Sequence, residues 1–121
     1  FDPKEFIQGA RGAYEMLAGA FARGDRDTLK PWLDTDVYEA WDGAISEREK
    51  TGAEAPQLLR IRHSEIEEAR LDGDIARVTV RFEAELGDGD LTRKSEEYWT
   101  FMRNISSDDP NWLLDDVDIA G

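Results

Sequence analysis

The 121-residue chain has no cysteine, a single histidine, and no apolar run of the roughly 20 residues that a membrane-spanning helix needs. The lack of cysteine excludes disulfides, thiol nucleophiles and cysteine-ligated zinc. Basic residues are also scarce, since 15 of them stand against 28 acidic residues and the formal net charge is −13. This charge argues against nucleic-acid binding, which needs a basic surface, and against adhesion of the whole domain to anionic lipid.

Apolar residues nevertheless make up 40% of the chain, and four Trp, three Tyr and five Phe are among them. That is enough apolar surface for a hydrophobic core, so a disordered chain is excluded. The length suits one domain. We therefore expect a single domain over 1–121, with a helical part at 1–52 and a sheet at 57–119.

The first half of the chain has helical periodicity. Asp2 and Pro3 are typical of a helix start, and Gly24 is typical of a helix end. Two further helices are expected after Asp25 and after Asp34. The long first helix contains glycines at positions 9, 12 and 19, and we expect them to allow another backbone to approach closely. Its apolar face consists of Phe6, Ala10, Ala13, Tyr14, Leu17 and Phe21.

The second half changes from a period of 3.6 to a period of 2. Residues 76–86 alternate between apolar and polar side chains, which predicts a strand with one buried and one wet face. Asp72-Gly73 predicts a hairpin turn, so residues 58–71 form the preceding strand, with a bulge near His63 and Ser64. A second turn at 87–90 and a third at 106–110 lead to strands at 94–105 and 112–119.

This order of elements predicts the α+β class, with helices packed on a curved four-stranded antiparallel sheet. The break in the long strand, together with the long helix above it, indicates strong curvature. A curved sheet wrapped over helices encloses a cone-shaped cavity.

Segments in nearly the whole chain carry a family resemblance: Phe1–Phe6, Gly9–Arg11, Ala20–Arg26, Leu29–Pro31, Val37–Glu39, Ile45, Arg48, Gly52, Ala76–Phe82, Trp99–Phe101, Arg103 and Asp109–Trp112. In this order and spacing they resemble the Tim-forty-four-like (Tim44-like) family, whose named member is a mitochondrial inner-membrane translocase subunit. The resemblance implies a cone-like fold similar to the nuclear transport factor two-like proteins. It also implies an apolar pocket and membrane association.

A ligand pocket is predicted where the first helix faces the sheet. Small residues on the helix leave room there, and a pocket without convergent polar groups suits an acyl chain or apolar partner side chains. The alternative is ordinary core packing of the same aromatic residues. The predicted pocket residues are Phe6, Ala10, Ala13, Tyr14, Leu17, Trp41, Val80, Phe82, Trp99 and Phe101.

No catalytic group, metal site or cofactor is predicted. His63 has no orienting partner in the sequence and is expected at the surface. The most plausible catalytic carboxylates are Asp42, beside Trp41, and Glu97, beside Tyr98 and Trp99, and both are expected to be solvated instead. The strand facing the helix offers no ionisable side chain, so we expect an inner face without charge. The stretch from Asp88 fails as a calcium loop, because Arg93 stands at its sixth position.

The function expected from the resemblance is a non-enzymatic, membrane-associated adaptor domain that binds an apolar partner segment or lipid. Expected partners are membrane lipid, a membrane protein, or a chaperone or translocase component, with no nucleic acid. The expected location is a bacterial inner membrane, peripherally or through an anchor before Phe1, since the chain does not begin with Met. A small-molecule enzyme of the cone fold and a dimerising scaffold that uses the outer sheet face, with its Arg77 and Arg81 salt pairs, are the alternatives.

Overall fold

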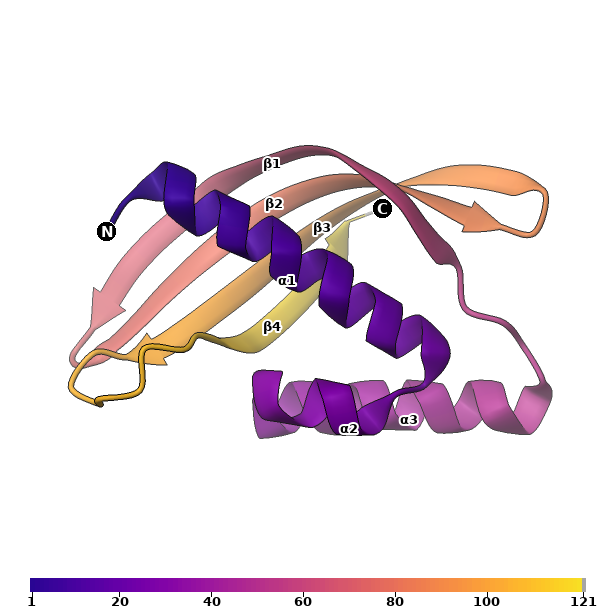
Figure 1. Ribbon diagram of the computed structural model, residues 1–121, viewed down its shortest axis with the longest axis horizontal. Helices are drawn as coiled ribbons and strands as arrows, with labels where there is room; N and C mark the ends of the chain where they lie inside the picture. The colour runs from indigo at the N-terminus through magenta and orange to yellow at the C-terminus, as the bar shows by residue number, and fades with distance from the viewer. Residues whose placement is uncertain (121) are drawn as a thin grey trace.

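The computed structural model describes residues 1–120, with helices on one face of a single antiparallel sheet (Figure 1). The strand order is β1-β2-β3-β4. We call the face toward the first helix the inner face and the opposite one the outer face. The predicted α+β class is confirmed. The elements are α1 (Pro3–Arg23), α2 (Arg26–Leu29), the 3-10 helix η1 (Lys30–Trp32), α3 (Thr35–Thr51), β1 (Gln57–Asp72), β2 (Ile75–Asp88), β3 (Leu91–Asn104) and β4 (Leu113–Ala120).

Helix α1 begins and ends as its sequence signals predict. The Asp2 side chain accepts a hydrogen bond of 3.0 Å from the backbone N–H of Lys4, which satisfies one of the free donors of the first turn. Gly24 ends the helix with φ of 70°, a left-handed conformation that costs glycine little. The expectation that glycines 9, 12 and 19 admit another backbone is wrong, because an added Cβ would meet nothing within 4 Å at position 9 or 12, and would meet only the Arg23 side chain at position 19.

Strand β1 arches over α1 (Figure 1). Its pairing with β2 shifts register between Leu58 and Arg60, between Ile61 and His63, and between Ile66 and Glu68. The predicted bulge near His63 is confirmed, and two more accompany it. Each bulge bends the strand locally, so a strand of 16 residues follows the helix instead of running straight past it.

The hairpin turns lie slightly differently from the prediction. The first two-residue loop is Gly73-Asp74, because Asp72 and Ile75 still pair. The second is Gly89-Asp90, since the ladder continues to the pair of Asp88 and Leu91. The sequence signal marks the turn regions well, but the exact loop residues depend on how far the ladder extends.

The core lies between the inner face and α1. In β2, alternate residues from Val78 to Ala84 are buried, as the pattern predicts. The helices α2, η1 and α3 attach at the β4 edge, where Leu33 forms a parallel bridge with Leu114 and the Asp34 N–H donates to the Leu114 carbonyl at 2.9 Å. This attachment places η1 beside β4.

Candidate functional site

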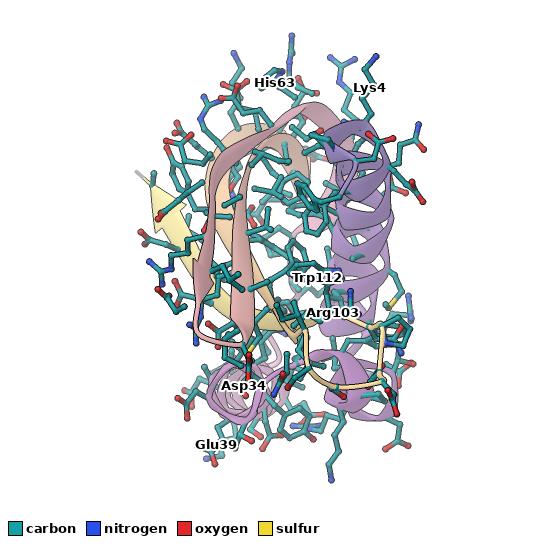
Figure 2. All side chains as sticks on the ribbon, turned by 90° about the vertical axis from the view of Figure 1, so that its left-hand side faces the viewer. Lys4, Asp34, Glu39, His63, Arg103 and Trp112 are labelled. Atoms are coloured by element: carbon teal, nitrogen blue, oxygen red, sulfur yellow. The ribbon has the colours of Figure 1, made fainter. Side chains whose placement is uncertain are left out.

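A groove of about 710 Å³ opens between the N-terminal half of α1 and the end of the sheet where β3 and β4 meet. Its walls come from α1, from Trp32 of η1, and from the segment that leads into β4. Figure 2 shows Trp112 in the layer between α1 and the sheet. We call this the apolar groove; it is lined by Phe1, Asp2, Glu5, Phe6, Gly9, Ala10, Gly12, Ala13, Met16, Leu17, Trp32, Phe101, Pro110, Asn111, Trp112 and Leu114.

Aromatic side chains build one end of the apolar groove. The ring of Phe6 packs edge-on against Trp112, with centroids 5.1 Å apart, and against Phe101 at 6.0 Å. Phe1 lies 5.4 Å from Phe6 and is 76% exposed, and Trp32 on the other wall is 39% exposed. Large aromatic residues left partly open to solvent around a cavity are typical of a surface that receives an apolar partner.

Small residues on α1 form the floor of the apolar groove. Gly9 and Gly12 lie on the exposed side of Ala10 and Ala13, and no heavy atom fills the space that their side chains would occupy. Each glycine costs the helix up to about 1 kcal/mol relative to alanine. Open space, rather than close backbone packing, is therefore what these glycines provide.

The structure divides the ten predicted pocket residues into two groups. Five of them line the apolar groove: Phe6, Ala10, Ala13, Leu17 and Phe101. The other five pack in or against the core beyond it: Tyr14, Trp41, Val80, Phe82 and Trp99. Ligand binding by either group stays a prediction.

The core group is closely packed. Tyr14 lies 4.5 Å from Phe82 and 4.6 Å from Trp99 between ring centroids, and Trp41 contacts Trp99 at 5.8 Å. Phe82 has no exposed surface. These rings fill the space under the sheet, which is the packing alternative that the sequence left open.

Sequence reasoning failed at Glu97. It was expected to be solvated, whereas it is 7% exposed and points from β3 toward α1 on the inner face. Its Oε2 accepts hydrogen bonds from Tyr14 Oη at 2.9 Å and Ser95 Oγ at 2.7 Å, and its Oε1 accepts one from Trp99 Nε1 at 3.0 Å. We call these four residues the Glu97 cluster. The expectation of an inner face without ionisable groups is therefore wrong.

The Glu97 cluster is a buried network of hydrogen bonds that connects α1 to β3. Burial, followed by the charge of Glu97 and the hydrogen bond to it, raises the pKa of Tyr14 far above its usual value. All three donors in the cluster are uncharged, and none of its members lines the apolar groove. Burying a carboxylate without a cation is expensive unless its oxygens are hydrogen-bonded, and here both oxygens are.

The other titratable candidates lie at the surface. His63 has a side chain 49% exposed, 3.5 Å from Glu65, and Figure 2 shows it at the outer edge of the molecule. Asp42 is 44% exposed and pairs with Arg26. Within residues 1–120, no three side chains of His, Asp and Glu gather as ligands for a metal ion.

The outer face carries the expected cross-strand ion pairs. Arg81 contacts Glu65 of β1 at 3.1 Å and Glu96 of β3 at 3.2 Å, and it also contacts Glu83 of its own strand at 3.0 Å. Arg77 contacts Asp115 at 3.0 Å. The predicted salt-pair interpretation of Arg77 and Arg81 is confirmed.

Comparisons with known proteins address the fold and the family. The intermembrane space region of the chloroplast protein ARC6 has a similar structure, with a TM-score of 0.62 and 13% sequence identity over 93% of this chain and 95% of that one. A de novo designed β-sheet protein matches with a TM-score of 0.49 and 18% identity, covering 97% of this chain and 88% of that chain. No curated protein matches the sequence.

In the described part of the chain, no helix has the length and apolar character needed to cross a bilayer. The model of the Tim44-like domain family matches residues 1–119, which is nearly the whole chain. Membership of this family supports a membrane-associated binding domain. The resemblance seen in the sequence is confirmed, and the chain belongs to the Tim44-like domain family.

Proposed function

We propose that this domain is a non-enzymatic, membrane-associated adaptor that binds apolar side chains of a partner segment, or an acyl chain, in the apolar groove. The observation that carries the proposal is the groove itself, which is open, lined with aromatic residues and placed on the inner face of a Tim44-like fold. Candidate partners are a membrane protein, a chaperone or translocase component, or membrane lipid. A bacterial inner membrane is the proposed location, and the ARC6 region, which shares the fold, is an intermembrane space region of a chloroplast protein.

Charge favours a protein segment over an anionic lipid. The carboxylates of Asp2 and Glu5 line the apolar groove, and the chain carries a net charge of −13. This field repels anionic headgroups and attracts a segment whose apolar side chains are flanked by Lys or Arg. An uncharged acyl chain is compatible with the groove, but its anionic headgroup would sit against the acidic rim.

The enzyme alternative rests on the pair of Tyr14 and Glu97, two titratable side chains that meet on the inner face. A general base must reach the proton that it abstracts. Both oxygens of Glu97 already accept hydrogen bonds from inside the core, and the apolar groove does not extend to them. These contacts support a structural role for the pair and a non-enzymatic domain.

The dimer alternative through the outer face stays a prediction. That face is covered with ion pairs such as those of Arg81, and stable homodimer interfaces are usually apolar. Sedimentation equilibrium at high protein concentration tests it, and a monomer there removes this alternative.

The test of the proposed function uses a matched pair of glycines. An added side chain at Gly12 would project into open space in the apolar groove, and one at Gly43 would project into open space on α3 away from it. Binding of the uncharged fluorescent probe N-phenyl-1-naphthylamine is measured for the wild type, Gly12→Phe and Gly43→Phe. We expect the wild type and Gly43→Phe to bind alike, and Gly12→Phe to lose binding.

The same three proteins are then tested with a synthetic amphipathic peptide that carries Lys at both ends, and with zwitterionic and anionic vesicles. Peptide binding that Gly12→Phe removes supports a protein partner. Binding to zwitterionic vesicles with the same loss supports an acyl chain. If the folded wild type binds none of the three, that is, not the probe, the peptide or the vesicles, the proposed function is wrong.

A further inference from the structure

Helix α1 has two polar attachments to the sheet, and they lie one turn apart. Arg11 Nη1 donates to Ser64 Oγ of β1 at 3.0 Å, and Tyr14 Oη donates to Glu97 Oε2 of β3 at 2.9 Å. The backbone of α1 approaches β1 more closely than any other strand. On the β3 side the helix stands further off, and there Tyr14 spans the gap to the sheet. The apolar groove opens on that same side.

The residues of α1 that line the groove lie on either side of Tyr14 in the helix. Ala10, Ala13 and Leu17 line the groove, and Tyr14 lies between them in the same two turns of the helix. Because the helix is a rigid element, a rotation of α1 or a shift away from the sheet at Tyr14 moves these lining residues as well. Apolar contacts alone tolerate such movements better than a hydrogen bond with a fixed direction.

The energetics indicate that the cluster serves geometry more than stability. A buried carboxylate without a cation loses its hydration, and its three uncharged donors return only part of that free energy. Replacing buried polar groups by apolar ones of similar volume is often neutral or stabilising. Glu97, which pairs with Phe82 across the strands, therefore lowers the stability of the core somewhat but fixes the position of α1.

We propose that the hydrogen bond between Tyr14 and Glu97 positions α1 at the height above β3 that keeps the apolar groove open to its ligand. Tyr14 and Glu97 are then positioning residues for the groove, although neither touches the bound segment. This inference rests on the proposed function, because it assigns a role in binding at that site.

The chain offers a matched control. Tyr98 Oη donates to Glu96 Oε1 at 2.8 Å, so it is a second tyrosine–glutamate pair on the same strand, but on the outer face. Tyr14→Phe and Tyr98→Phe each remove one hydroxyl that donates to a carboxylate. Binding of N-phenyl-1-naphthylamine is measured for both variants, with circular dichroism and thermal melting to confirm folding. We expect Tyr14→Phe to raise the Kd about three- to tenfold, and Tyr98→Phe to leave it unchanged.

Hydrogen exchange provides a readout that needs no ligand. In free Tyr14→Phe, we expect the amides of residues 10–17 to exchange about tenfold faster relative to those of β2, because α1 loses its attachment to β3. In free Tyr98→Phe the ratio should stay as in the wild type. Faster exchange without any probe binding in the wild type would contradict the proposed function while leaving the positioning of α1 intact.

A double variant separates geometry from stability. Tyr14→Phe combined with Glu97→Gln removes the hydrogen bond to α1 together with the buried carboxylate, while the amide of the new side chain still accepts from Trp99 Nε1 and donates to Ser95 Oγ. We therefore expect it to be more stable than Tyr14→Phe alone and still to bind the probe weakly. It also covers the case in which Tyr14→Phe does not fold. A folded double variant, or a folded Tyr14→Phe, that binds like the wild type would overturn the inference.

Discussion

Glu96 and Glu97 are neighbours on β3, and they show how differently the two faces of one sheet are built. Glu96 points outward, where hydrogen bonds from Tyr98 and then Arg81 hold its pKa below the usual value. Glu97 points inward, where Tyr14, Ser95 and Trp99 donate to it, and no basic side chain within residues 1–120 forms an ion pair with it. On the outer face acidic side chains pair with basic ones, whereas on the inner face uncharged donors form the hydrogen bonds to one carboxylate.

The difference between the two faces follows from their different exposure to water. On the outer face water screens each charge, so an ion pair there contributes little and can be rearranged at little cost. On the inner face neither water nor a spare partner can replace a missing donor, so each hydrogen bond is tied to one position of α1. The ion pairs of the outer face can therefore rearrange, and the hydrogen bonds of the inner face fix the geometry around the apolar groove.

The largest expected difference between the faces is seen by truncating adjacent residues of β2. Phe82 is fully buried on the inner face, and Arg81 lies on the outer face with three acidic partners. We expect Phe82→Ala to lower the free energy of unfolding by about 3–5 kcal/mol, because it leaves a cavity. Arg81→Ala should lower it far less, because solvent screens the ion pairs that it loses. Urea denaturation measures both, and equal losses would contradict the comparison.

The second comparison uses the two tyrosine–glutamate pairs. Tyr14→Phe should lower the free energy of unfolding by about 1–3 kcal/mol, because one buried acceptor site on Glu97 loses its donor. Tyr98→Phe should lower it by a smaller amount, since water replaces the lost hydroxyl at Glu96. Urea midpoints measured side by side give both values. A larger loss in Tyr98→Phe would show that the inner hydrogen bond is not the stronger one.

Most of the fold could be predicted from local sequence. The cap at Asp2, the helix end at Gly24 and the alternation in β2 are short-range signals, and each fixes an element without reference to the rest of the chain. The turn residues moved by one or two positions, because the ladder between β2 and β3 runs to the tip of its hairpin. Pairing across strands decides that length, and no local pattern contains it.

The candidate site was harder to predict, for two physical reasons. Trp112 and Trp32 reach the apolar groove from segments without periodicity, so their faces could not be read from spacing. Glu97 did carry a signal, because alternation from Trp99 and Phe101 places it on the same inner face. Its partner Tyr14 is 83 positions away in sequence, and only the packing of α1 brings the two together.

A smaller effect is expected where the inner face is open instead of packed. Gly12→Ala and Gly43→Ala each add a methyl group to an exposed helix position with nothing nearby. Both should raise the free energy of unfolding by about 0.5–1 kcal/mol, because alanine favours the helix. Only Gly12→Ala should also weaken binding of N-phenyl-1-naphthylamine, since Gly12 lines the apolar groove. Destabilisation by Gly12→Ala would show that the groove floor is already filled.

The smallest effect is expected from acid on the outer face. Hydrogen bonds from Arg60 and Arg62 lower the pKa of Glu85 from 4.5 to about 2. Between these two values the unfolded chain binds a proton that the folded protein does not. The contribution of Glu85 is therefore complete above pH 4.5 and is lost as the pH falls toward 2.

Glu85→Gln isolates this contribution. In urea denaturation the wild type should be slightly more stable than Glu85→Gln at pH 7, and the difference should vanish near pH 2. At pH 7, 1 M salt should reduce the same difference, because it screens exposed charges. A difference that persists unchanged in acid and in salt would mean that the outer face resembles the inner one in holding its carboxylates by directed, unscreened bonds.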